Sequence, residues 1–326
     1  MKKPIYYDAI KKLTDLYPSA GNLTIAKMAV RDNPLLFSDV EQARTRVRYY
    51  RGQLGAKSRR QSLSTIPPVE LNPGKRTIVG FAPYVVTLPC HALVLSDVHI
   101  PYQDDEALSS ALECGKKEGV DTVILNGDAI DCHSISYFAT APSERDFKGE
   151  LKQAKAFLSL LRKKFPNAKI IYKLGNHEER YESYMLNKAP ELLEEPYFAF
   201  ESVYDLNSLD IDLVDDKRKI KIGDLNVIHG HEVMRGKAVP VNPARMLFLK
   251  ARTYAIMGHL HQDSRHQGKD LNDRVVACWS TGCLCDLHPR YAPYNEWAHG
   301  FALVTAEKDG TFEVRTPVVK KGRVLS

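Results

Sequence analysis

The chain has 326 residues, of which 44% are hydrophobic and 26% are charged, and its formal net charge is +6. This composition is that of a globular protein, and the length favours one large domain with a smaller one beside it. No stretch approaches 18 consecutive apolar residues, so we expect no membrane span. Lys2 and Lys3 are not followed by the apolar stretch of a signal peptide, which favours a cytoplasmic protein.

Positive charge is concentrated at the N-terminus. Residues 1–60 contain thirteen Lys or Arg and five Asp or Glu, a balance of +8. Because the whole chain has 46 basic and 40 acidic residues, the remainder carries 33 and 35, a balance of −2. Such an asymmetry indicates an appended module that binds an anionic partner.

This N-terminal module, residues 1–60, is predicted to contain three short helices. They cover 5–16, 23–31 and a segment that begins at a capping box starting with Ser38. The third helix has an apolar face and a basic face, formed respectively by Val40, Ala43, Val47 and Tyr50 and by Arg44, Arg48 and Arg51. The pattern resembles a helix-turn-helix module, whose last helix enters the major groove of DNA. A protein-docking unit with solvated arginines fits the same pattern.

A linker is predicted between the module and the rest of the chain. Residues 55–64 are polar and basic, and Pro67-Pro68 follow, so we assign the linker to 61–75. Runs rich in β-branched residues resume at Thr77-Ile78-Val79 and at Tyr84-Val85-Val86-Thr87. These begin a second domain, which we place at 76–326.

Strand-like and helix-like segments alternate in this second domain. Short apolar runs at 92–95, 122–125, 170–172, 225–228 and 254–257 predict buried strands. Helices are predicted over 104–118, 144–165 (with Ser143 as its cap) and 178–188, and shorter β runs dominate from 211 onwards. The mixture predicts an α/β fold in which two mixed β-sheets pack face to face with helices outside. The whole chain would then be a four-layer sandwich with a small all-α module.

Five short segments rich in Asp, His and Asn each follow one of these apolar runs. They read Asp97-Val98-His99, Gly127-Asp128-Ala129-Ile130-Asp131, Gly175-Asn176-His177-Glu178, His229-Gly230-His231 and Gly258-His259-Leu260-His261. Together they supply seven oxygen and nitrogen donors and no thiolate. That set suits two adjacent divalent metals, bridged by a carboxylate, and disfavours a structural zinc cage. The six cysteines form no paired zinc pattern, and we interpret them as buried free thiols.

In this order the segments resemble the calcineurin-like metallophosphoesterase superfamily, whose pattern is D-x-H, G-D-x-x-D, G-N-H-[DE], a lone His and G-H-x-H. The likeness covers roughly residues 90–315. It implies the four-layer fold and two divalent ions, with Mn preferred and Fe, Zn, Ni or Mg as alternatives. A hydroxide held between the ions would attack phosphorus. The ligands carried over are Asp97, His99 and His261 for one metal, Asp128 as the bridge, and Asn176, His229 and His259 for the other.

The resemblance also implies two catalytic residues that bind no metal. His177 would face the leaving-group oxygen, and Asp131 would fix the tautomer of its imidazole and raise its basicity. Glu178 either supports this site or is the first residue of a helix. His231 and Arg235 are further candidates for contacting a phosphate, since an arginine there can bind it through two hydrogen bonds. Exposure to solvent without a function is the default interpretation of both side chains.

The substrate is indicated less directly than the chemistry. The Gly-His-Leu-His ending favours phosphodiesterases and nucleases, whereas the Gly-Asn-His-Glu spelling favours phosphatases. Protein phosphatases of the family usually have Arg after the last Asp of the second motif, where this chain has Cys132. Together with the basic module, this favours a phosphodiesterase or nuclease acting on DNA or RNA. The alternatives are a phosphomonoesterase for small molecules or proteins and a non-catalytic nucleic-acid-binding protein that keeps the fold.

Overall fold

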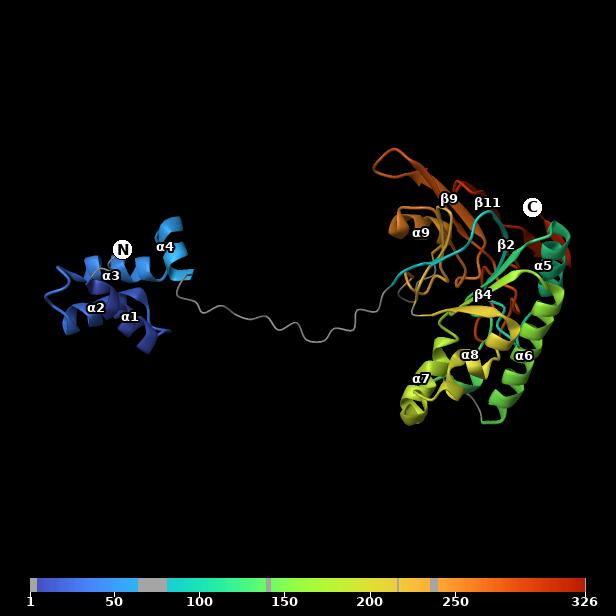
Figure 1. The fold of residues 1–326 in the computed structure, drawn as a ribbon, viewed down its shortest axis with the longest axis horizontal. Helices are drawn as coiled ribbons and strands as arrows, with labels where there is room; N and C mark the ends of the chain where they lie inside the picture. The colour runs from blue at the N-terminus through green and yellow to red at the C-terminus, as the bar shows by residue number, and fades with distance from the viewer. Residues whose placement is uncertain (1–4, 64–80, 139–141, 216, 235–239, 326) are drawn as a thin grey trace. The chain divides into compact units, whose positions relative to one another are not determined.

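The computed structural model describes residues 5–63, 81–138, 142–215, 217–234 and 240–325 (Figure 1). The chain divides into two compact units, 1–78 and 79–326, and each has a hydrophobic core of its own. Residues 64–75 of the predicted linker and the β-type run Thr77-Ile78-Val79 lie outside the described residues. Among the helices of the described segments, none combines the length and apolar character needed to cross a membrane.

The N-terminal unit is helical. Its helices are α1 (Tyr6–Leu16), α2 (Asn22–Asp32), α3 (Val40–Tyr50) and α4 (Gly55–Leu63). Ile10 of α1, Ile25 of α2 and Val47 of α3 are at most 1% exposed and meet in one small core. The three predicted helices are therefore confirmed, and the apolar face predicted for the third helix is the face that packs.

Helix α4 was not predicted, because residues 55–64 were interpreted as the start of a linker. The segment is rich in Lys, Arg, Gln and Ala, which are good helix formers even where no apolar stripe reveals the helix. Ser58 fixes it to the unit: its buried hydroxyl donates to the carbonyl of Tyr49 at 2.6 Å and accepts from the N–H of Leu54 at 3.3 Å. The assignment of residues 61–63 to the linker is wrong, since they belong to α4.

Two helix starts differ from the predictions in the same way. The N-cap of α3 is Asp39 rather than Ser38, and its carboxylate accepts from the N–H of Gln42. The N-cap of α6 (Phe147–Lys164) is Asp146 rather than Ser143. In both cases an Asp close behind the predicted Ser caps the helix, so the helix begins later than expected.

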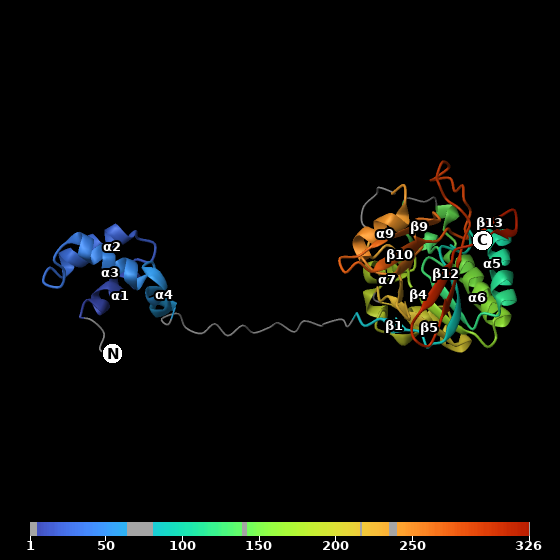
Figure 2. The ribbon, with the colours of Figure 1, turned by 90° about the horizontal axis from the view of Figure 1, so that it is seen from above.

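Two six-stranded sheets make up the centre of the second unit in its described part (Figures 1 and 2). The first sheet runs in the order β12 (Phe312–Arg315), β11 (Ala302–Ala306), β2 (Cys90–Leu95), β3 (Thr122–Asn126), β4 (Lys169–Lys173), β5 (Ile211–Val214). The second runs β1 (Tyr84–Val85), β6 (Ile220–Ile222), β7 (Leu225–Val227), β8 (Ala255–Met257), β10 (Val275–Ser280), β9 (Ser264–Lys269). A separate hairpin pairs β13 (Val318–Lys320) with β14 (Arg323–Leu325).

Helices cover the outer faces of both sheets. Successive side chains of a strand point to opposite faces, and β2 shows the consequence. Leu93 and Leu95 pack with α5 (Asp105–Glu118) and α6, whereas Ala92 and Val94 face the second sheet. On the far side, α9 (Pro243–Ala251) packs on β8 and β10. The predicted four-layer α/β sandwich is therefore confirmed. Among the described residues, this unit also contains the α-helices α7 (Glu179–Lys188) and α8 (Phe200–Val203).

The strand directions bring the motif segments together. Strands β2, β3, β4 and β5 are parallel neighbours in the first sheet, and β7 and β8 are parallel in the second. The carboxyl ends of parallel strands lie at one edge of a sheet, where the following loops form binding sites. Each of the five motif segments follows the carboxyl end of one of these strands.

Candidate dinuclear metal centre

The motif loops hold their side chains inward through an unusual backbone. Five of the seven predicted ligands have left-handed φ angles between 50° and 68°, namely Asp97, His99, Asp128, His259 and His261. This conformation costs a residue other than glycine roughly 1–2 kcal/mol, and it is retained mainly at functional sites. Gly127 shows how closely the loops pack: a Cβ at this position would lie 2.4 Å from Nδ1 of His229.

Asp128 lies among three imidazoles of the cluster. One of its carboxylate oxygens, Oδ2, is 3.2 Å from Nε2 of His229, 3.9 Å from Nε2 of His99 and 3.7 Å from Nε2 of His177. The other oxygen accepts a hydrogen bond from the N–H of His177 at 2.9 Å. Asp128 therefore stands between two groups of imidazoles, which is the position that a bridging carboxylate needs.

Asp97 provides the clearest evidence that the cluster fits a cation. Its Oδ2 accepts from the N–H of His259 at 2.8 Å, but Oδ1 is buried and accepts no hydrogen bond from any described residue. Three imidazole nitrogens surround Oδ1, with Nε2 of His261 at 3.3 Å and those of His99 and His229 at 4.0 Å. A buried carboxylate oxygen without a hydrogen-bond donor is costly unless a metal occupies its lone pairs.

The remaining predicted ligands complete the cluster. Oδ1 of Asn176 is 3.2 Å from Nε2 of His229, and Asp128, His229 and His259 present ligand atoms within 4.8 Å of one another. Burial lowers the pKa of His229, but the carboxylates of Asp128 and Asp97 outweigh it and raise that pKa to about 10. The carboxylates thus draw in positive charge. The donor set fits two divalent ions, while the assignment of each ligand stays a prediction.

His177 and Asp131 lie beside each other, as predicted. Nδ1 of His177 is 3.2 Å from Oδ2 of Asp131, and the same oxygen is 2.9 Å from Nδ1 of His99. Burial alone would raise the pKa of Asp131, but hydrogen bonds from His177 and His99 hold it below its usual range. Asp131 therefore orients one predicted metal ligand as well as the predicted proton donor, whose catalytic role stays a prediction.

Arg180 is a member of the site that the sequence did not reveal. It lies three residues after His177 in the first turn of α7, and one guanidinium nitrogen is 3.0 Å from Nε2 of His177. The other donates to the carbonyl and to Oδ1 of Asp131, at 3.0 and 3.2 Å. The only available signal was its helical spacing from His177.

Of the two alternatives that the sequence left open for Glu178, the structure favours support of the site, because helix α7 begins one residue later at Glu179. Glu178 occupies the N-cap position of α7, and its carboxylate is 1% exposed. That carboxylate accepts hydrogen bonds from four groups, which are the N–H groups of Asp128, Ile130 and Gly175 and the hydroxyl of Tyr172. Its function is to hold two motif loops together.

The loop that carries His229 is fixed by a buried ion pair. Nζ of Lys173, which is fully buried at the end of β4, lies 2.8 Å from a carboxylate oxygen of Glu232. Glu232 in turn accepts from the N–H groups of His229 at 3.3 Å and Gly230 at 2.7 Å. Burial raises the pKa of Glu232, but the charge and hydrogen bond of Lys173, together with His231 and His229, outweigh it and lower the pKa to about 2. Neither residue was predicted from the sequence, because nothing in the sequence indicates that Lys173 and Glu232 form an ion pair.

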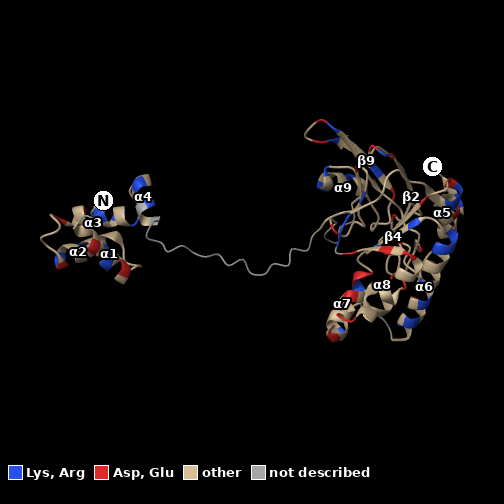
Figure 3. Ribbon diagram, viewed as in Figure 1, with Lys and Arg blue, Asp and Glu red and all other residues tan. Residues whose placement is uncertain are grey.

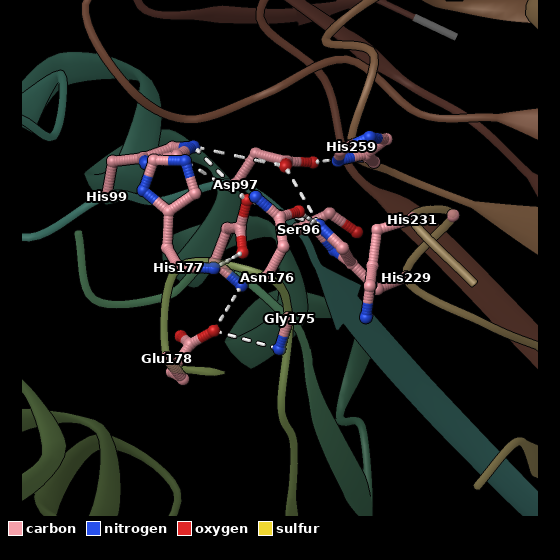
Figure 4. A network of polar contacts seen from close by, with 12 residues as sticks. Ser96, Asp97, His99, Gly175, Asn176, His177, Glu178, His229, His231 and His259 are labelled. Carbon is pink, nitrogen blue, oxygen red and sulfur yellow. Dashed lines mark hydrogen bonds and ion pairs between the residues drawn. The ribbon is translucent and has the colours of Figure 1, made fainter. Parts of the chain in front are cut away.

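Of the two additional candidates for phosphate binding, the structure describes only His231. His231 lies beside His229, and its Nε2 is 3.0 Å from a carboxylate oxygen of Glu179 rather than facing the cluster directly (Figure 4). Arg235 lies outside the described residues. Neither role is tested by the geometry.

The cysteines are free, as predicted, and five of the six are buried. Cys285 lies closer to the site than expected, with its Sγ 3.9 Å from Nδ1 of His261. The thiol is buried and contacts the Nδ1 side of the His261 imidazole, whereas Nε2 of that ring faces Asp97.

Basic positions lie along α3 and α4 of the N-terminal unit (Figure 3). The three arginines predicted to contact nucleic acid differ in their surroundings. Arg44 is exposed and lies 3.3 Å from Glu41, and Arg48 is exposed in the last turn of α3. Arg51 turns inward, where its guanidinium donates to the carbonyl of Ala20 at 2.8 Å and to Oδ1 of Asn22 at 2.9 Å. Binding of nucleic acid stays a prediction for all three.

This fold and this buried Asp/His centre of dimetal type define a metal-dependent phosphoesterase. Residues 91–291 match the family described as calcineurin-like phosphoesterase, and the chain belongs to that family. The gene 54 proteins of Mycobacterium phages L5 and D29 are each 26% identical to it over 241 residues, which cover 70% of this chain and 93% of theirs.

Similar solved structures have low sequence identity. Vps29 from Entamoeba histolytica, in complex with zinc, is 13% identical with a TM-score of 0.36 and covers 72% of this chain and 96% of its own. The phosphoesterase YfcE from E. coli is 10% identical with a TM-score of 0.33, covering 69% and 98%. A dimetal phosphatase from Danio rerio is 12% identical with a TM-score of 0.34, covering 71% and 95%.

Proposed function

We propose that the protein is a dinuclear, metal-dependent phosphodiesterase that cleaves DNA or RNA. The observation that carries the chemistry is the pair of buried carboxylates, Asp97 and Asp128, surrounded by imidazole nitrogens. The nucleic-acid substrate is supported by the +8 balance of residues 1–60, because clustered Lys and Arg concentrate polyanions near a site. Mn is our preferred ion, since carboxylate and imidazole ligands suit it.

Bound at this centre, two divalent ions would supply an activated water and stabilise the oxygens of an in-line displacement at phosphorus. The chain's own residues position the ester and move the proton. Asp131 holds Nδ1 of His177, so that Nε2 is directed to the leaving oxygen and can protonate it. Arg180 contacts Nε2 at 3.0 Å in this arrangement. We therefore expect its guanidinium to turn from His177 to a phosphoryl oxygen when substrate binds.

One purified sample distinguishes the candidate functions. The Mn-loaded protein is assayed with bis(4-nitrophenyl) phosphate, a diester, and with 4-nitrophenyl phosphate, a monoester. It is then given end-labelled single-stranded DNA, duplex DNA and RNA. Faster turnover of the diester together with cleavage of a nucleic acid supports the proposal. A preference for the monoester favours a phosphomonoesterase instead. Bound metal without turnover of either ester favours a non-catalytic binding protein.

A further inference from the structure

A pocket of about 740 Å³ opens beside the candidate metal centre. Asn176, a predicted metal ligand, lines it, as does Arg180, which contacts His177 and Asp131. Residues that follow β3, including Tyr137 and Phe138, also line it. A substrate bound at the metals can therefore extend directly into this pocket.

The wall of the pocket carries two stacked aromatic rings. The ring centroids of Tyr137 and Phe138 are 4.3 Å apart and their planes differ by 30°. Tyr137 is 86% exposed and Phe138 is 50% exposed, so this aromatic surface faces solvent rather than a core. Exposed aromatic surface next to a catalytic centre indicates a ligand with a flat, apolar face.

Two arginines contact Phe138 of the aromatic pair. The guanidinium carbon of Arg180 lies 5.6 Å from the ring centroid of Phe138, and Arg145 donates to the carbonyl of Phe138 at 3.2 Å. Arg180 therefore touches the aromatic pair on one side and the groups that would handle the phosphoester on the other. A ligand that matches the arrangement of aromatic pair, Arg180 and metal centre has a phosphate close to a planar ring.

We propose that Tyr137 and Phe138 form a stacking platform for the nucleobase of the nucleoside next to the scissile phosphate. The proposal rests on the proposed function and narrows its substrate to a phosphodiester with an unpaired base. Aromatic side chains beside cations bind single strands in this way, because every base has a face to stack. In a duplex, neighbouring base pairs cover those faces, so a single strand or a nucleotide ester is the substrate that fits.

The test compares two diesters that share a leaving group. Mn-loaded full-length protein is given thymidine 5′-(4-nitrophenyl phosphate) and methyl 4-nitrophenyl phosphate, and the ratio of their kcat/KM values measures the preference for a nucleoside. Tyr137→Ser should lower this ratio about fivefold or more, whereas Tyr137→Trp should keep it. Tyr197→Ser is the matched control, because Tyr197 is 84% exposed and does not line this pocket.

An unchanged ratio in Tyr137→Ser overturns the platform. If the wild type hydrolyses neither diester, the proposed function fails, and the platform is then judged by binding alone. Quenching of 2-aminopurine deoxyriboside 5′-monophosphate fluorescence should be strong with the wild type and weak with Tyr137→Ser. Equal quenching by both proteins overturns the proposal, and the aromatic pair is then a docking surface for another protein. A last comparison uses a pentathymidylate ester of the same nitrophenol. A higher kcat/KM for this ester than for the mononucleoside ester indicates that the base belongs to a strand, whereas equal values indicate a free nucleotide.

Discussion

The carboxylate of Glu178 accepts a hydrogen bond from the N–H of Asp128 at 2.9 Å, although fifty residues separate the two in the sequence. This bond joins the loop after β3 to the turn after β4. The second oxygen of the carboxylate binds the N–H of Ile130 in the same loop. The position of Asp128, the predicted bridging carboxylate, thus depends on Glu178, which is not itself a predicted metal ligand.

Glu178→Gln should destabilise the protein. A carboxylate accepts at both oxygens, whereas an amide directs its NH₂ group at N–H donors that then lose their acceptor. We expect the free energy of unfolding to fall by about 2 kcal/mol or more, measured by urea denaturation. Glu182→Gln is the control, since Glu182 is exposed on the same helix. Equal stability of the two variants would show that the four hydrogen bonds are dispensable.

Lys173→Met should be more costly than an ordinary surface change. It leaves Glu232, whose side chain is only 11% exposed, without the lysine counter-ion, for which the expected loss is about 3–5 kcal/mol. Lys217→Met removes an ion pair with Glu179 in which the lysine is 53% exposed, and should cost less than about 1 kcal/mol. Thermal unfolding of both variants checks the difference. Similar losses in the two would refute a special role for the buried pair.

The fold, and the gathering of the Asp and His residues of the motifs in one cluster, could be predicted because their signals are local. Each motif follows an apolar run, and Asp97 and Asp128 are therefore presented at the ends of parallel strands. Interactions between residues far apart in the sequence left no such signal. The sequence of β9 is polar and alternates between half-buried and exposed residues at a sheet edge, so no apolar run revealed it. Lys173 appears in the sequence only as a charged residue at the end of a strand, and its ion pair with Glu232 becomes visible only in the structure.

Asp128→Ala should remove most of the bound metal and abolish turnover. The imidazoles would lose the carboxylate that is predicted to bridge the two metals, and only an anion can offset two adjacent dications. The metal content per chain, measured by mass spectrometry after gel filtration, checks the first point. Asp224→Ala, which changes an exposed aspartate, should leave it unchanged. A variant at position 128 that keeps two metals and near-normal turnover contradicts the assignment.

His177→Ala should spare metal binding and slow turnover by about a hundredfold, which is typical of a lost general acid. The loss should be smaller for a nitrophenyl ester, because a nitrophenolate leaves without a proton. Rates on a nitrophenyl diester and on an alkyl diester measure the difference, and His288→Ala, at an exposed histidine, is the control. Equal losses on both esters would mean that His177 does not deliver the proton.

Removing residues 1–78 should separate recruitment of nucleic acid from hydrolysis. The second unit has its own core, so the truncated chain should keep its metals and its turnover of a small diester. Its affinity for nucleic acid should fall. The slope of log K against log salt should also become shallower, by roughly 0.9 for each phosphate of duplex DNA that the truncated chain no longer neutralises. Binding titrations between low and physiological salt measure both quantities.

Point substitutions identify the side chains responsible within the intact module. Arg44→Gln and Arg48→Gln together should weaken binding without unfolding the unit, because both side chains are exposed. Arg51→Gln should instead lower its stability, since Arg51 holds the turn before α2 through Ala20 and Asn22. If the truncated chain binds and cuts nucleic acid like the full chain at every salt concentration, residues 1–78 form a docking unit. The nucleic-acid substrate must then be reconsidered, because that choice depends on the N-terminal charge more than on the metal centre.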